Sequence, residues 1–176
     1  MLRKRTLFWA LAAVGLVGCN QRSASPAPPK EIVIAAGEIG SRLPDFSVKD
    51  LQGREISSAD LRGKVVLIDF WATWCQPCKK EMSGYQKLLD LYGSRGFAVI
   101  GLKADMMKDT EDPLEFAKKI GVRYSLAVAT DDMTKKFGGI EGLPTTLLYD
   151  RSGLLRKKII GFEYTDTIEV DLKSLL

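Results

Sequence analysis

Runs and stripes of apolar residues divide the chain after residue 43 into alternating strands and helices. Nearly continuous apolar runs at 65–70 and 97–102 are typical of strands buried on both faces. Apolar side chains at helical spacing predict a helix from the cysteines at 75 and 78 to a stop at Gly93. The other expected elements are a hairpin within 44–56, helices at 112–120 and 132–137, strands at 126–128, 145–149 and 155–160, and a final helix carrying Ile168, Leu172 and Leu175. This order predicts an α/β domain with a mixed central sheet, helices on both faces and an N-terminal β-hairpin extension.

The first twenty residues have the pattern of an export signal. Arg3-Lys4-Arg5 precede a twelve-residue apolar stretch from Leu7 to Gly18, which is too short to span a bilayer as a helix. The stretch ends in Leu16-Val17-Gly18-Cys19, which resembles the lipobox of bacterial lipoproteins. That resemblance implies a signal peptide over 1–18 and acyl chains on Cys19 that hold the protein on a membrane. The alternative is a free cysteine that ends a short buried helix.

Residues 19–42 are expected to form a tether between that anchor and a folded domain over 43–176. Ser23, Ser25 and three prolines lie among small residues without apolar periodicity. Only 32–34, with the sequence Ile-Val-Ile, could form a short strand.

Composition and charge exclude several classes of function. The chain has 176 residues, three cysteines and no histidine, which excludes Ser-His-Asp catalysis and zinc sites of cysteine and histidine. The formal net charge is +4, but without residues 1–18 there are 26 − 3 = 23 basic against 22 acidic residues. A nearly neutral domain gives no electrostatic reason to expect a nucleic-acid partner.

Cys75 and Cys78 form a C-x-x-C motif between a buried strand and a helix. A thiolate at a helix N-terminus is stabilised by unpaired backbone N–H groups, and a second thiol one turn later can resolve a mixed disulfide. Zinc would need two further ligands, and haem attachment would need a histidine where Lys79 stands. The motif therefore favours redox catalysis over a purely structural disulfide.

The segment from Phe70 to Cys78, with the sequence Phe-Trp-Ala-Thr-Trp-Cys-Gln-Pro-Cys, resembles the active site of the thioredoxin superfamily. Within it, the hairpin, a longer central region around 105–120 and the sequence Gly-Leu-Pro-Thr at 142–145 resemble the TlpA/ResA-type membrane-anchored reductases. The resemblance implies a thioredoxin fold, a monomeric exported reductase of protein disulfides without metal or cofactor, and a membrane thiol donor of DsbD/CcdA type. Ser83 stands where that family often has a proline.

The resemblance also suggests roles for five further residues. Glu81 matches the glutamate that tunes the cysteine pair, and Asp69 matches the buried acid of thioredoxin that takes a proton during resolution. A solvated first-turn Glu81 and an edge-exposed Asp69 are the alternatives. Trp74 is expected at the rim of the site, and Leu143 and Pro144 are expected to bind an extended substrate strand through a cis proline beside the cysteines.

Two other functions stay open on the sequence. A thiol peroxidase shares the fold, but residues 71–74 lack the proline and spacing of a peroxidatic site. A binding lipoprotein with a permanent disulfide is the second alternative. The substrate also stays open between an apocytochrome c, a copper-site protein and misformed disulfides in general.

Overall fold

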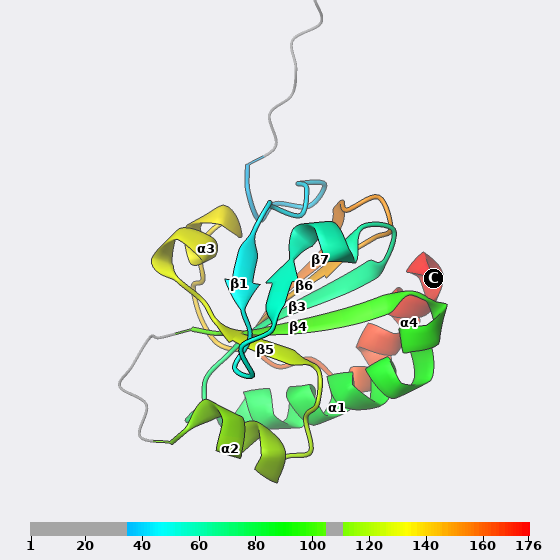
Figure 1. Cartoon of the computed structure of the whole chain (residues 1–176). Coiled ribbons are helices and arrows are strands. Elements are labelled where there is room, and N and C mark those ends of the chain that lie inside the picture. The colour runs from blue at the N-terminus through cyan, green and yellow to red at the C-terminus, as the bar shows by residue number, and fades with distance from the viewer. Residues whose placement is uncertain (1–34, 105–110) are drawn as a thin grey trace, which may run out of the picture. The chain divides into compact units, whose positions relative to one another are not determined.

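Figure 1 shows the protein as a central twisted sheet with helices packed against it, in a computed structural model that describes residues 35–104 and 111–176. The five strands have the order β5-β4-β3-β6-β7. On one side of β3, β4 runs parallel to β3 and β5 runs parallel to β4. On the other side, β6 runs antiparallel to β3 and β7 runs antiparallel to β6. Their bounds are β3 (Val65–Trp71), β4 (Phe97–Lys103), β5 (Ser125–Val128), β6 (Thr145–Tyr149) and β7 (Leu155–Ile160). The predicted mixed sheet is therefore confirmed, with β3 at its centre.

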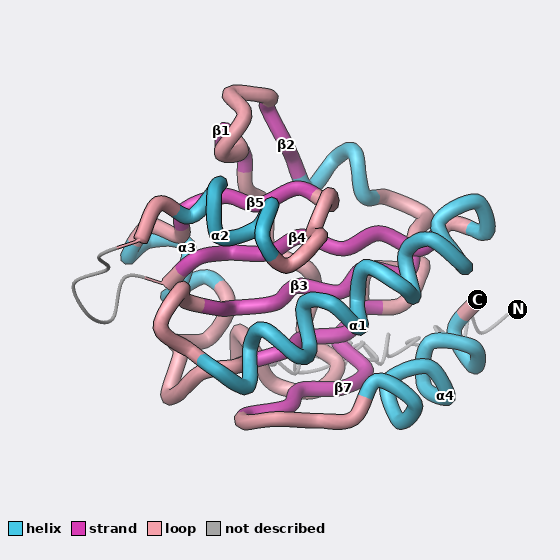
Figure 2. Tube along the Cα trace, turned by 90° about the horizontal axis from the view of Figure 1, so that it is seen from below, coloured by secondary structure: helices cyan, strands magenta, loops and turns pink. Residues whose placement is uncertain are grey.

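Helices cover both faces of the sheet, as the sequence predicts. Within the described residues these are α1 (Gln76–Tyr92), α2 (Pro113–Lys119), α3 (Asp131–Lys136) and α4 (Thr165–Leu175). Figures 1 and 2 show α1, α2 and α4 on one face and α3 on the other. Alternate residues of β3 supply two separate cores: Leu67 and Trp71 pack with α1, α2 and α4, whereas Ile68 and Phe70 pack toward α3.

An N-terminal hairpin of β1 (Ser47–Lys49) and β2 (Glu55–Ser57) packs beside the second core and is followed by a short 3₁₀ helix, η1 (Ser58–Leu61). Its turn is stabilised by the buried Asp50, whose Oδ1 accepts hydrogen bonds from the backbone N–H groups of Gln52 and Arg54. The N–H of Leu51 donates to the carbonyl of Leu126 at 2.7 Å and so fastens the turn to β5. The predicted hairpin extension is confirmed.

The folded part of the chain begins before Leu43, where the sequence places its start. The amide of Gly40 donates to the carbonyl of Leu155, and the amide of Leu155 donates to the carbonyl of Ser41, both at 2.8 Å. The last residues of the predicted 19–42 tether therefore cover the outer edge of β7. No apolar periodicity marks this pairing, because it uses backbone groups. The predicted signal peptide, Cys19, residues 32–34 and residues 105–110 lie outside the described part of the chain.

Local sequence explains the ends of α1, the helix that positions the cysteines. Cys75 is its N-cap and Pro77 lies in its first turn, where a missing N–H costs little. Gly93 caps the other end as predicted, but the left-handed turn follows later, at Gly96 with φ 89° after a second 3₁₀ helix, η2 (Gly93–Arg95). Among the described residues, no helix has the length and hydrophobicity needed to cross a membrane.

Candidate active site

Cys75 and Cys78 are joined by a disulfide at the N-terminus of α1, directly after the central strand. The backbone N–H of Cys78 also donates to the sulfur of Cys75 at 3.3 Å. In the reduced protein, the same N–H would point at the Cys75 thiolate. Its partial positive charge would stabilise the negative charge on that sulfur. Cys75 keeps 3% of its surface exposed and Cys78 none, so an approaching sulfur meets Cys75 first.

Two tryptophans before the disulfide have different environments. Trp71 is fully buried and stacks on Phe116 of α2, with ring centroids 5.3 Å apart, and Lys79 places its Nζ 5.2 Å from the same phenyl ring. Trp71 therefore fixes α2 against the start of α1. Trp74, predicted at the rim of the site, directly precedes Cys75 in the chain and is 43% exposed.

Glu81 lies in the buried face of α1, one turn after Cys78, with only 1% of its surface exposed. Its Oε1 accepts a hydrogen bond of 2.7 Å from the backbone N–H of Glu163, whereas its Oε2 has no hydrogen-bond partner within the described residues. Burial raises the pKa of Glu81 to about 7, against the lowering effect of that hydrogen bond. The carboxyl can therefore hold or release a proton near neutral pH, and the solvated alternative is excluded.

Asp69 lies at the middle of β3 and is completely buried, so the edge-exposed alternative is excluded as well. Its neighbours in the sheet are Gly101 of β4 and Thr146 of β6. Neither carboxyl oxygen has a hydrogen-bond partner in the described part of the chain. Burial, and then repulsion from Glu81, raise the pKa of Asp69 well above its usual range. Asp69 therefore binds a proton more tightly than an exposed aspartate does.

The Leu143–Pro144 peptide bond is cis, as the sequence resemblance suggests. Because Thr145 pairs with Phe70 in the sheet, Pro144 lies next to the end of β3 that leads into the cysteines. The carbonyl of Pro144 accepts a 2.8 Å hydrogen bond from the N–H of Gly161. One loop, between β7 and α4, thus contacts both Pro144 and Glu81.

That loop contains the site residues that sequence reasoning missed. Glu163 supplies the N–H that holds Glu81, although the two residues are 82 positions apart. Phe162 and Tyr164 beside it are 43% and 71% exposed, and their rings meet edge to face with centroids 5.1 Å apart. Two exposed aromatic residues after a strand are the signal that could have indicated this surface.

Five of the seven residues predicted for the site lie in one region, where β3 ends and β6 begins. Trp74, Cys75 and Cys78 follow β3, and Leu143 and Pro144 precede β6. Glu81 and Asp69 lie in the core beneath them. Across residues 35–104 and 111–176, no group of three acidic or cysteine side chains could hold a metal ion. The site thus places a disulfide above two buried carboxyl groups.

Comparison with known proteins decides the family. The model of the AhpC/TSA family matches residues 39–158, which is more than half of the chain. The chain belongs to the AhpC/TSA family. Within it, the chain belongs to the ResA-like thiol-disulfide oxidoreductases. It is 34% identical over 137 residues to a protein of that name from Geobacillus thermodenitrificans, covering 78% of each chain. It is 37% identical over 141 residues to one from Bacillus cereus, covering 78% of this chain and 79% of that one.

Solved structures confirm the thioredoxin fold predicted for this family member. A thiol:disulfide interchange protein of the thioredoxin family from Chlorobium tepidum TLS superposes with a TM-score of 0.71 at 29% identity, over 80% of this chain and 99% of that one. A thiol:disulfide interchange protein from a Bacteroides species gives a TM-score of 0.62 at 26% identity, over 77% and 91% of the two chains. The protein is thus a thioredoxin-fold thiol-disulfide oxidoreductase.

Proposed function

We propose that this oxidoreductase reduces disulfides of partner proteins outside the cytoplasm, with Cys75 as the attacking thiol and Cys78 as the resolving thiol. The observation that supports this most is the disulfide at the N-cap of α1, in which Cys75 is the more accessible sulfur. A permanent structural disulfide has no need of two proton-holding carboxyls beneath it.

The reaction transfers two electrons from the reduced protein to its substrate. The Cys75 thiolate attacks a substrate disulfide, forms a mixed disulfide and expels one substrate sulfur as a thiolate. Cys78 then loses its proton and attacks the Cys75 sulfur, which forms the intramolecular disulfide and releases the second substrate thiolate. A dithiol donor then reduces the Cys75–Cys78 disulfide by two electrons and is itself oxidised to a disulfide, and one proton restores the Cys78 thiol beside the Cys75 thiolate. The proposed donor is a membrane protein of DsbD/CcdA type.

The buried carboxyls provide an acceptor for the proton that Cys78 loses during resolution. A buried thiol cannot pass its proton directly to bulk water, so resolution needs an acceptor within the protein. We assign this task to Glu81, whose pKa of about 7 leaves it substantially ionised at neutral pH. Asp69 assists by exchanging a proton with Glu81, to which it is electrostatically coupled.

Substrates are proposed to be proteins that offer an extended segment. Trp74 directly precedes Cys75, Leu143 and Pro144 come just before β6 beside the end of β3, and the exposed rings of Phe162 and Tyr164 belong to the loop that contacts Pro144. The backbone at Leu143 would pair with the substrate segment, and the aromatic side chains would contact its apolar residues.

The protein is further proposed to act as a monomer, anchored to a bacterial membrane through acyl chains on Cys19. This assignment rests on the apolar stretch and the lipobox-like sequence that ends at Cys19. It places the domain in the periplasm or an equivalent extracytoplasmic space, where protein disulfides form.

Trapping of mixed disulfides tests the proposed function. Cys78→Ser should accumulate covalent complexes with extracytoplasmic proteins on non-reducing gels, because the second step is blocked. Cys75→Ser is the matched control and should trap few or none. The reverse pattern would exchange the two roles. Peroxide consumption at rates that exceed disulfide reduction would instead favour the thiol peroxidase alternative.

A further inference from the structure

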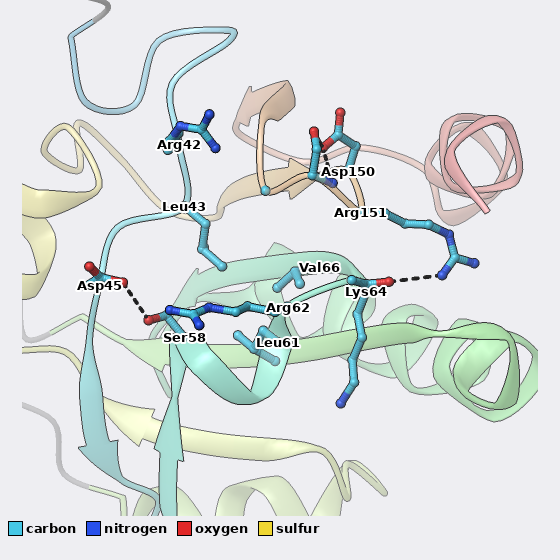
Figure 3. A pocket seen from close by; sticks show the side chains of 13 residues that line it. Arg42, Leu43, Asp45, Ser58, Leu61, Arg62, Lys64, Val66, Asp150 and Arg151 are labelled. Carbon is cyan, nitrogen blue, oxygen red and sulfur yellow. Dashed lines mark hydrogen bonds between the residues drawn. The ribbon is translucent and has the colours of Figure 1, made fainter.

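A cavity of about 300 Å³ opens at the end of the sheet remote from the disulfide. Three segments form its wall: residues 42–45, the stretch from Ser58 through η1 to Lys64, and the β6–β7 turn at 150–153. Figure 3 shows the side chains of Arg42 and Arg62 on separate segments, with Arg42 at the upper left and Arg62 beside Ser58. Four basic and two acidic residues are among those that line the cavity.

Both acidic residues of the cavity already have partners. Asp150 accepts hydrogen bonds from Ser152 and Leu154 of its own turn, and its other oxygen pairs with Arg156 at 2.5 Å. These interactions lower the pKa of Asp150 to about 2, despite its partial burial, so it remains ionised and bound within the turn. Asp45 accepts a 3.3 Å hydrogen bond from Ser58.

The basic residues differ in how they are used. Arg151 turns away from the cavity and donates to the carbonyl oxygens of Gly63, Arg95 and Leu176. Arg42 and Arg62, by contrast, are exposed and make no ion pair or side-chain hydrogen bond to any residue in the described ranges. Exposed guanidinium groups on the wall of a cavity attract an anion with several oxygens, because their N–H groups match its geometry.

We propose that this cavity, called here the Arg42/Arg62 cavity, binds the phosphate headgroup of an anionic membrane lipid. The argument for a lipid rests in part on the proposed anchor. Only 16 positions separate Cys19 from the first described residue, Ala35, so an extended connection spans at most about 55 Å. An anchored domain is therefore held close to headgroups, and basic residues near an anionic leaflet are attracted to it.

Binding there would orient the active site. β3 starts beside the cavity, at Val65, and leads at its other end to Cys75. Seven strand residues span about 23 Å. A domain resting on headgroups through the Arg42/Arg62 cavity therefore holds its disulfide away from the membrane, toward soluble partner proteins.

The test compares vesicle binding by full-length chains that cannot be acylated, all carrying Cys19→Ser. One variant adds Arg42→Gln and Arg62→Gln. The control variant adds Lys49→Gln and Lys135→Gln, which remove the same charge from exposed residues outside the cavity. Sedimentation with vesicles of phosphatidylcholine, with and without about 30% phosphatidylglycerol, measures the affinity. Contributions of the N-terminal segment are equal in all chains and cancel in the comparison.

We expect binding that requires phosphatidylglycerol, a loss of about tenfold in the cavity variant and a loss below about threefold in the control. Equal losses of affinity in both variants would mean that binding depends only on the net charge, and would overturn the proposal. Equal affinity for vesicles with and without phosphatidylglycerol would overturn it as well. Displacement by millimolar inorganic phosphate at constant ionic strength would assign the cavity to free phosphate instead of lipid. Insulin reduction in the same preparations tests the proposed reductase separately, since neither pair of substitutions contacts the disulfide.

Discussion

Replacing Glu81 by Gln should change how the stability of the oxidised protein depends on pH. Burial raises the pKa of Glu81 from 4.5 to about 7 in the folded protein, whereas the unfolded chain keeps the ordinary value. The folded state therefore binds this proton more tightly than the unfolded state. The resulting stabilisation is complete below pH 4.5 and is lost as the pH rises through 7. Glutamine cannot ionise, so the variant does not undergo this loss.

The size of the effect follows from the two pKa values. Their difference, 7 − 4.5 = 2.5, corresponds to at most about 3 kcal/mol of unfolding free energy. Because Glu81 lies beneath a surface loop, solvent relaxation reduces this value, and we expect about 2 kcal/mol. Between about pH 5 and pH 8.5, the unfolding free energy of Glu81→Gln should rise by that amount relative to the wild type. The value of about 7 already includes the repulsion by the Glu163 carboxyl, which acts in the same direction as burial.

Urea unfolding of the oxidised proteins at several pH values measures this difference. Glu141→Gln is a suitable control, because Glu141 is exposed and makes no side-chain hydrogen bond within the described residues. Its stability curve should run parallel to that of the wild type. If the Glu81→Gln curve is also parallel over the whole range, Glu81 does not titrate as its burial requires, and the proposed proton acceptor is wrong.

Three further predictions concern separate parts of the chain. Cys19→Ala should shift the protein from the membrane to the soluble fraction or block its processing, and unchanged detergent-dependent association would contradict the anchor. Asp69→Asn should slow resolution of a mixed disulfide about tenfold or more at neutral pH in quenched-flow gels; a wild-type rate would make this residue structural. Gly101→Ala should cost about 1–3 kcal/mol in urea unfolding, because its Cβ would lie 2.4 Å from Leu126. Gly142→Ala, where the nearest contact is 3.7 Å, should cost less, and equal losses would refute this packing argument.

Most of the fold could be predicted from the sequence because its elements have strong local patterns. The apolar run of β3 and the helical stripe of α1 specify both the type and the approximate ends of these elements. Asp112-Pro113 likewise marks the start of α2, where the Asp112 side chain accepts hydrogen bonds from two backbone amides. The pairing of residues 40–43 with β7 and its turn could not be predicted, since backbone hydrogen bonds leave no side-chain pattern.

The residues themselves identify most directly the covalent part of the site, whereas the cis Leu143–Pro144 bond was expected from the family resemblance. The C-x-x-C spacing identifies Cys75 and Cys78 directly, because two thiols at that spacing can form a disulfide. The burial of Asp69 could not be decided from β3 alone, since it depends on which strands flank it. The contact between Glu81 and Glu163 has no local signal either, because it forms through a backbone amide 82 positions away.

The loop between β7 and α4 also makes the surroundings of Glu81 depend on residues much later in the chain. Glu163 follows Glu81 by 82 positions, and its amide is the hydrogen-bond donor to the Glu81 carboxylate. The cysteines therefore leave the ribosome well before the segment that completes their surroundings. Until the C-terminal segment has folded, they form an ordinary dithiol in an open chain, exposed to oxidation and exchange. Because closing so long a loop is entropically costly, we expect this contact to form after the local helices and turns, so the surroundings of Glu81 are completed late in folding.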